Sequence, residues 1–197
     1  VWWSSPDPMS LSPKSSTLAI LVFGEILFGL GDSLLIAAGI GNTPWTVLAE
    51  GISNYAETWT VGEATFIVSV AVMFLWIPIK ETPGIGTILN AIIIALTIHV
   101  MVPILPQPET LLGSILMASS GIILVGIGSA MYLTSNLGPG PRDGWMTGIQ
   151  RVTGVPIGRV RITIEVSVLL IGYMLGGTAW IGTLMFALAI GPVVASC

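Results

Sequence analysis

The sequence predicts an all-α polytopic membrane protein with six transmembrane helices, arranged as two inverted-topology repeats of three. Composition gives the first observation. The mean hydropathy is +0.94 and only 8% of the 197 residues are charged, whereas soluble domains carry about 25% charged residues. The second observation is a set of apolar stretches long enough to cross a bilayer. The third is that the glycine and proline residues between these stretches recur at a fixed spacing.

The repeat is carried by glycine and proline residues, which mark backbone requirements rather than general apolarity. An offset of 97 residues aligns the following pairs: Gly29 with Gly126, Gly31 with Gly128, Gly41 with Gly138, Pro44 with Pro141 and Gly51 with Gly148. At an offset of 96, Ile85-Gly86-Thr87 aligns with Ile181-Gly182-Thr183. Because each copy has three spans, the second copy must enter the membrane from the opposite side, an arrangement common in secondary transporters.

Six spans follow from the apolar stretches. The first copy has them at about residues 18–38, 64–79 and 85–105, and the second at about 111–133, 160–175 and 179–195. A short amphipathic helix follows the first span of each copy. One begins at Pro44 with Thr43 as its expected N-cap, and the other covers about residues 141–152. We divide the chain into a disordered cytoplasmic tail (1–17), a first three-helix repeat (18–108) and a second one (109–197), which together form one membrane domain.

The basic residues give an independent indication of orientation. With the N-terminus in the cytoplasm, six crossings leave all of them inside, as the positive-inside rule requires. These residues are Lys14, Lys80, Arg142, Arg151, Arg159 and Arg161. The loop after the first span then lies outside and carries Glu50, Glu57 and Glu63. We therefore expect both termini in the cytoplasm.

Five segments carry a resemblance to a known family: Gly39-Ile40-Gly41-Asn42-Thr43-Pro44-Trp45, Pro83-Gly84-Ile85-Gly86-Thr87, Gly138-Pro139-Gly140-Pro141-Arg142-Asp143-Gly144, Arg161-Ile162-Thr163-Ile164-Glu165 and Gly182-Thr183. With them the chain resembles the bacterial YczE/YyaS/YitT-type integral membrane proteins, most closely the YczE-like branch, over about residues 28–193. Two positions depart from the family pattern. Thr46 stands where an acidic residue is expected after the tryptophan, and Glu25 stands in a span that is otherwise apolar. The resemblance implies a small bacterial inner-membrane protein and supplies no substrate.

The paired loops are the first candidate for a binding site. The free N–H groups and the positive end of a short helix can hold an anion or a polar group. The candidate substrate-binding residues are Thr43, Pro44, Trp45, Gly138, Gly140, Pro141, Arg142, Asp143 and Trp145. The alternative is that both short helices lie flat in the headgroup regions, with Trp45 and Trp145 as anchors at opposite interfaces. Asp143, near a helix start, also fits a capping role.

Two carboxylates within the spans, Glu25 and Glu165, are candidates for proton or ion coupling. A charged group inside a membrane is costly and is usually functional. Arg161 lies one helical turn before Glu165, so a structural ion pair is the alternative reading of that residue. Glu25 has no basic neighbour in the sequence, and it can also lie protonated against other helices.

The composition argues against several functional classes. A single His99 and a single Cys197 do not favour a metal site, and the glycine-rich loop lacks the Gly-Lys-Ser/Thr ending of a P-loop. We therefore expect no enzyme and no cofactor. The net charge of −4 without a basic tract does not favour a nucleic-acid partner.

We expect a secondary transporter or exporter of an unidentified small solute, embedded in the lipid bilayer. Its site would lie between the two copies, which alternate in access to the two sides. Six spans make a small transporter, so a homodimer is the alternative to a monomer for enclosing the pathway. A second functional reading is a non-transporting membrane protein that assists the assembly or regulation of another system.

Overall fold

Eight α-helices make up the fold. The computed structural model describes residues 3–8, 10, 12–56 and 58–196, and these residues contain no strand. The helices are α1 (Ser15–Ala38), α2 (Pro44–Ala56), α3 (Val61–Phe74), α4 (Ile85–Met101), α5 (Leu111–Ser135), α6 (Pro141–Thr153), α7 (Ile157–Met174) and α8 (Ile181–Ser196). The expected all-helical class is confirmed, and a helix lies at each expected span and at each short segment. Glu57 lies outside the described residues.

Within the described residues, α1 and α5 are long and apolar enough to cross a membrane. They contain 24 and 25 residues, and an 18-residue stretch within each has a mean hydropathy of 2.0 and 2.1, respectively. At 1.5 Å per residue each is about 36 Å long, more than the ~30 Å hydrocarbon core. The apolar helices α3, α4 and α8 are shorter. The fold therefore has the apolar helices of a membrane protein, and the number of six crossings stays a prediction.

The segment before α1 is hydrogen-bonded to the end of α5. The backbone N–H of Ser5 donates to the carbonyl oxygen of Ser135 at 2.8 Å, and the side-chain amide of Asn136 donates to the carbonyl oxygen of Ser5 at 2.8 Å. These bonds tie the segment before α1 to the end of α5.

Four glycines allow the backbones of α1 and α5 to touch. A Cβ atom on Gly31 would lie 2.6 Å from the carbonyl oxygen of Gly121, and a Cβ atom on Gly121 would lie 2.7 Å from that of Gly31. Gly24 and Gly128 form a second contact of the same kind. Gly24 aligns with Gly121 and Gly31 with Gly128 at the offset of 97. The contact between Gly31 and Gly121 is therefore equivalent to the contact between Gly128 and Gly24. Small residues of this kind let membrane helices approach closely.

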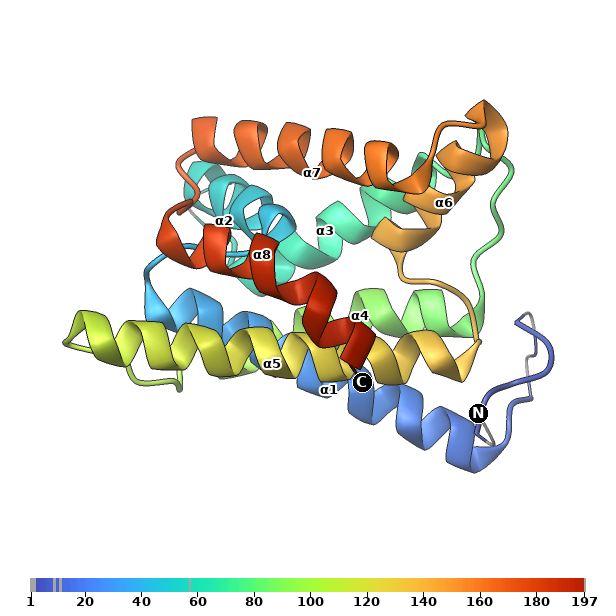
Figure 1. Cartoon of the computed structure of the whole chain (residues 1–197), viewed down its shortest axis with the longest axis horizontal. Coiled ribbons are helices and arrows are strands. Elements are labelled where there is room, and N and C mark those ends of the chain that lie inside the picture. The colour runs from blue at the N-terminus through green and yellow to red at the C-terminus, as the bar shows by residue number, and fades with distance from the viewer. Residues whose placement is uncertain (1–2, 9, 11, 57, 197) are drawn as a thin grey trace.

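The helices lie in three groups (Figure 1). α1, α4 and α5 form one side, α7 forms the opposite side, and α2, α3, α6 and α8 lie between them. The two copies differ in one respect. In the first copy α3 packs along α4, whereas α7 has no comparable contact with α8 and packs instead on α2 and α6.

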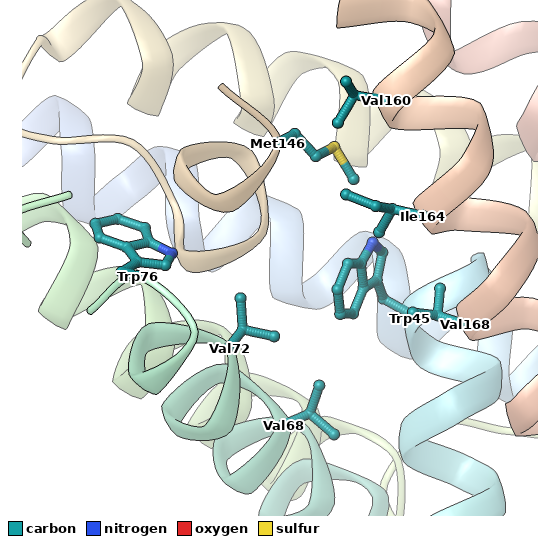
Figure 2. Packing of buried hydrophobic residues seen from close by; sticks show 8 residues of the cluster. All are labelled: Trp45, Val68, Val72, Trp76, Met146, Val160, Ile164 and Val168. Carbon is teal, nitrogen blue, oxygen red and sulfur yellow. The ribbon is translucent and has the colours of Figure 1, made fainter. Parts of the chain in front are cut away.

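The core between α2, α3, α6 and α7 is built from residues of both copies. Figure 2 shows eight of its buried side chains, which are Trp45, Val68, Val72, Trp76, Met146, Val160, Ile164 and Val168. Trp76 is only 2% exposed, and its indole N–H donates to the carbonyl oxygen of Pro141 at 3.0 Å. Gly144 leaves the space that the Trp76 ring fills. This contact fixes the first turn of α6 against the segment that follows α3.

Each loop after a long helix is hydrogen-bonded to a helix start in the other copy. The N–H of Gly182 donates to the carbonyl oxygen of Ile40 at 2.7 Å, and the N–H of Gly86 donates to that of Leu137 at 2.8 Å. The two bonds join equivalent residues, because Ile40 aligns with Leu137 at the offset of 97 and Gly86 with Gly182 at the offset of 96. The starts of α2 and α6 are therefore held in the same way.

Charged side chains on α2 and α6 strengthen these contacts. Glu50 accepts hydrogen bonds from the N–H and the hydroxyl of Thr178, at 2.7 and 2.9 Å, and from the amide of Asn42 at 2.8 Å. Arg151 forms an ion pair with Glu81 at 3.0 Å. Both charged groups thus join a short helix of one copy to the other copy.

We expect Glu50→Gln to lower the free energy of unfolding by about 1–2 kcal/mol, because the amide keeps only one acceptor oxygen for three donors and carries no charge. The midpoint of thermal unfolding in mild detergent measures the change. Glu109→Gln, at an exposed position between α4 and α5, is the matched control and should leave the midpoint unchanged. Equal midpoints for the two variants would contradict a stabilising role for Glu50.

Candidate functional site

A cavity of about 280 Å³, called here the central cavity, lies among the starts of α2 and α6 and the helices α1, α3, α4, α5, α7 and α8. Seven of the eleven candidate residues line it: Thr43, Pro44, Trp45, Gly140, Arg142, Asp143 and Glu165. The two loops thus contribute to one cavity although they are about 97 residues apart in the sequence. Small-molecule sites usually occupy about 300–1,000 Å³, so the cavity suits a small solute.

The other four candidate residues lie outside the lining. Gly138 forms the turn before α6 with a φ of 106° and packs on Gly84. Pro141 occupies the first position of α6 and is buried. Trp145 packs against the core described above, and Glu25 is buried within α1.

The two tryptophans exclude the flat arrangement of the short helices. The ring centroids of Trp45 and Trp145 are 6.4 Å apart, with the rings at 73° in an edge-to-face contact. Anchors at opposite interfaces would be separated by about the ~30 Å hydrocarbon thickness. The interpretation of Trp45 and Trp145 as markers of the two interfaces is therefore wrong.

The starts of α2 and α6 are built differently. Thr43 is the N-cap of α2 as expected, since its hydroxyl oxygen accepts from the N–H of Thr46 at 3.3 Å. Asp143 does not cap α6, which has no side-chain cap at Gly140. The Asp143 carboxylate instead accepts a hydrogen bond from the hydroxyl of Tyr132 in α5. Tyr132 is a further candidate residue of the site. Its only signal in the sequence is the position of a tyrosine near the end of an apolar span.

Among the described residues, Arg142 is one of the four charged ones that line the cavity. Its guanidinium carbon lies 5.4 Å from the centroid of the Trp45 ring, a cation–π contact between residues that align at the offset of 97. Arg142 also interacts electrostatically with Asp32, Asp143 and Glu165. These groups come from α1, α6 and α7, so the cavity collects charges from segments far apart in the sequence.

Asp32 is a functional candidate that the sequence analysis left out. Its side chain is fully buried, and one carboxylate oxygen accepts from the hydroxyl of Thr46 at 3.2 Å. The other oxygen has no hydrogen-bond partner in the part of the chain that the structure describes. An aspartate within an apolar span was the available signal, and only the fold shows that it interacts electrostatically with Arg142.

Arg161 and Glu165 form the ion pair that their spacing on α7 predicts. The guanidinium Nε of Arg161 lies 2.8 Å from a carboxylate oxygen of Glu165, and the side chains are 50% and 28% exposed. Both residues line the central cavity. The pair is therefore a structural contact and part of the cavity wall at the same time.

Glu25 lies one layer behind the cavity. Its side chain is fully buried, and neither oxygen has a hydrogen-bond partner among the described residues. Asn90 of α4 is the polar side chain that approaches it, without the geometry of a formed hydrogen bond. Asn90 itself lines the cavity, whereas Glu25 does not.

Much of the lining consists of residues that align between the two copies. The aligned pairs that both line the cavity are Phe28 with Val125, Thr43 with Gly140, Trp45 with Arg142, Thr65 with Arg161, Ser69 with Glu165, Asn90 with Phe186 and Ile94 with Ile190. In three of them, the first copy supplies an aromatic or neutral polar side chain where the second supplies a charge. The cavity thus has equivalent positions on its two sides with different chemistry.

The chain is similar to a family and to three curated relatives. Residues 15–197 match the model of a family described as "Family of unknown function (DUF6198)". An uncharacterized protein of Haemophilus influenzae is 44% identical over 178 residues, which cover 90% of this chain and 81% of the relative. No solved structure matches the chain.

Two relatives in Bacillus subtilis carry the names that the sequence resemblance suggested. The uncharacterized membrane protein YczE is 31% identical over 87% of this chain and 80% of its own length. The uncharacterized protein YyaS is 25% identical, with 82% of each chain covered. The resemblance to YczE and YyaS is therefore confirmed.

Proposed function

Because the chain belongs to the DUF6198 family of unknown function and is a membrane protein, we propose that it is a small secondary transporter or exporter whose solute binds in the central cavity. The observation that carries this proposal is that both aligned loops line the same cavity. In transporters built from two inverted repeats, the binding site lies at the interface of the repeats and is formed by interrupted helices.

We further propose six membrane crossings in two inverted repeats. Support comes from the exchanged glycine contacts of α1 and α5 and from the equivalent loop bonds, both of which relate one copy to the other by the same offset. The positive-inside rule supports cytoplasmic termini in a bacterial inner membrane. On this proposal the protein is embedded in the lipid bilayer and binds a small solute. A homodimer is the alternative to a monomer.

The difference in packing between the copies supports alternating access. α3 packs on α4, whereas α7 and α8 both line the cavity without packing on each other. We propose that the cavity opens between α7 and α8 in this state. An exchange of the two arrangements, with α7 closing on α8 and α3 leaving α4, would open the cavity to the opposite side.

Thiol labelling of a cavity residue tests this function without knowledge of the solute. In a chain with Cys197 replaced by serine, we expect Ser129→Cys to react with a small hydrophilic thiol reagent in both right-side-out and inside-out vesicles. Ser129 is 8% exposed and lines the cavity, and alternating access would bring it into contact with each aqueous phase in turn.

Ser120→Cys is the matched control, because it lies on the exposed face of the same helix and should face lipid. It should react from neither side. Reaction of Ser129→Cys from one side only would contradict alternating access and would favour a non-transporting membrane protein.

A further inference from the structure

The guanidinium group of Arg142 has no direct polar partner within the described part of the chain. The ion pairs there are Arg151 with Glu81 and Arg161 with Glu165, and the close contact of Arg142 is the face of the Trp45 ring. A guanidinium group carries five N–H donors and stays charged in proteins. The N–H donors point outward in the guanidinium plane, and the face of an aromatic ring does not accept hydrogen bonds from them there. They therefore need hydrogen-bond acceptors inside the cavity.

The other charged groups that line the cavity are already engaged. Arg161 and Glu165 pair with each other at 2.8 Å, and the Asp143 carboxylate accepts from the Tyr132 hydroxyl. Arg142 is therefore the lining charge that is available to a ligand.

Two helix starts reinforce the positive character of this region. α2 and α6 have 13 residues each, and their first residues or N-caps, Thr43, Pro44 and Gly140, line the same cavity. The N-terminal end of a helix carries about half a positive charge and exposes backbone N–H groups. Two such ends and one unpaired guanidinium group favour a negatively charged ligand.

Asp32 is a fully buried acidic group beside the start of α2. It interacts electrostatically with Arg142 and lies behind the lining, held by the hydroxyl of Thr46. Its second oxygen is free of hydrogen bonds to the described residues. Asp32 and Arg142 form no ion pair within 4 Å among the described residues. The N–H groups of Arg142 are therefore not bonded to Asp32 and can bind a ligand in the cavity.

We propose that Arg142 binds the anionic group, a carboxylate or a phosphate, of a small solute in the central cavity, and that Asp32 competes with this solute for Arg142. This inference rests on the proposed function, of which it names the class of solute. A guanidinium group can bind two oxygens of one anion through two parallel N–H groups.

Anion-dependent stabilisation of the purified protein tests the proposal. The protein in phosphatidylcholine nanodiscs is heated with sodium acetate, sodium succinate or sodium phosphate, each against sodium chloride at equal ionic strength. A probe present at about ten times its Kd should raise the unfolding midpoint by roughly 3 °C. Acetate and succinate report a carboxylate site, and phosphate reports a phosphate site.

Four variants identify the residues that cause the shift. Arg142→Gln should abolish it, and Arg142→Lys should reduce it, because lysine keeps the charge without the fork of donors. Asp32→Asn should tighten binding several-fold, since it removes the competing charge and keeps an oxygen for Thr46. Arg159→Gln, at an exposed position on α7, is the control and should match the wild type. If Arg142→Gln does not fold, Arg142→Lys and Asp32→Asn still test the proposal.

Several outcomes would overturn the inference. The first is that about 50 mM probe does not raise the unfolding midpoint of the wild type. The second is that the midpoint rises equally in Arg142→Lys and the wild type while Asp32→Asn binds no more tightly than the wild type. The third is that phosphatidylglycerol in the nanodisc raises the midpoint but none of the soluble anions does. The last result would assign the site to a lipid headgroup. If Ser129→Cys is labelled from both sides but anions do not raise the unfolding midpoint, transport is supported and the solute belongs to another class. If anions raise the midpoint but labelling occurs from one side only, the anion site is supported and transport is contradicted.

Discussion

Replacing Gly31 with alanine should separate α1 from α5 and remove most of the folded protein from the membrane. The new Cβ would lie 2.6 Å from the carbonyl oxygen of Gly121 and 2.7 Å from the backbone nitrogen of Val125. Both are backbone atoms of a packed helix, so no rotamer change relieves the clash. Overpacking costs about 1–3 kcal/mol and sometimes more, and we expect a loss of about 3 kcal/mol or more here.

The yield of monodisperse protein after detergent extraction and the unfolding midpoint both report this loss. Gly158→Ala is the control, because a Cβ at Gly158 meets no atom within 4 Å and the residue lies in the first turn of α7. It should be neutral or slightly stabilising. A normal yield and midpoint for Gly31→Ala would show that the two long helices are not in backbone contact.

Replacing Glu25 with methionine should stabilise the protein and abolish solute-driven proton uptake into proteoliposomes. A buried polar group without a hydrogen bond costs about 1–3 kcal/mol, and both Glu25 oxygens are in that situation within the described structure. An unbranched apolar side chain of similar length removes this cost. If Glu25 carries the coupled proton, the gain in stability comes with a loss of function, as is common at functional sites.

The control for this variant is Ile122→Met, at the position that aligns with Glu25 at the offset of 97. An exchange between apolar side chains of similar volume should change stability by less than about 1.5 kcal/mol and leave proton uptake intact. Increased stability with normal proton uptake would show that Glu25 is a buried structural residue. Decreased stability would show that its carboxyl group has a partner.

The positions of the helices could be predicted because they depend on local chemistry. The aligned glycines and prolines mark where the backbone turns, Thr43 caps α2 as expected, and the spacing of Arg161 and Glu165 on one helix face produces the observed ion pair. None of these features requires knowledge of the tertiary fold.

The convergence of the loops could not be predicted in the same way. Charged residues on α2 and α6 favoured helices lying at the water interface, because charges need solvation. The protein satisfies Glu50 through Thr178, whereas Arg151 stays 56% exposed while it pairs with Glu81. Thr178 and Glu81 are distant in the sequence from the residues that they bind. Such contacts are set by tertiary packing, which hydrophobic periodicity does not encode.

The reciprocal bonds of the two loops have a consequence for synthesis. The ribosome delivers the chain from its N-terminus, so Gly86 is already present when the Leu137 carbonyl that accepts its N–H is made. The Ile40 carbonyl, in contrast, is made early and accepts from Gly182 in α8. Until α8 arrives, the backbone of this early loop must be hydrated or held by the insertion machinery, since lipid offers it no donor. A helix made about 140 residues later thus supplies the donor for this early loop.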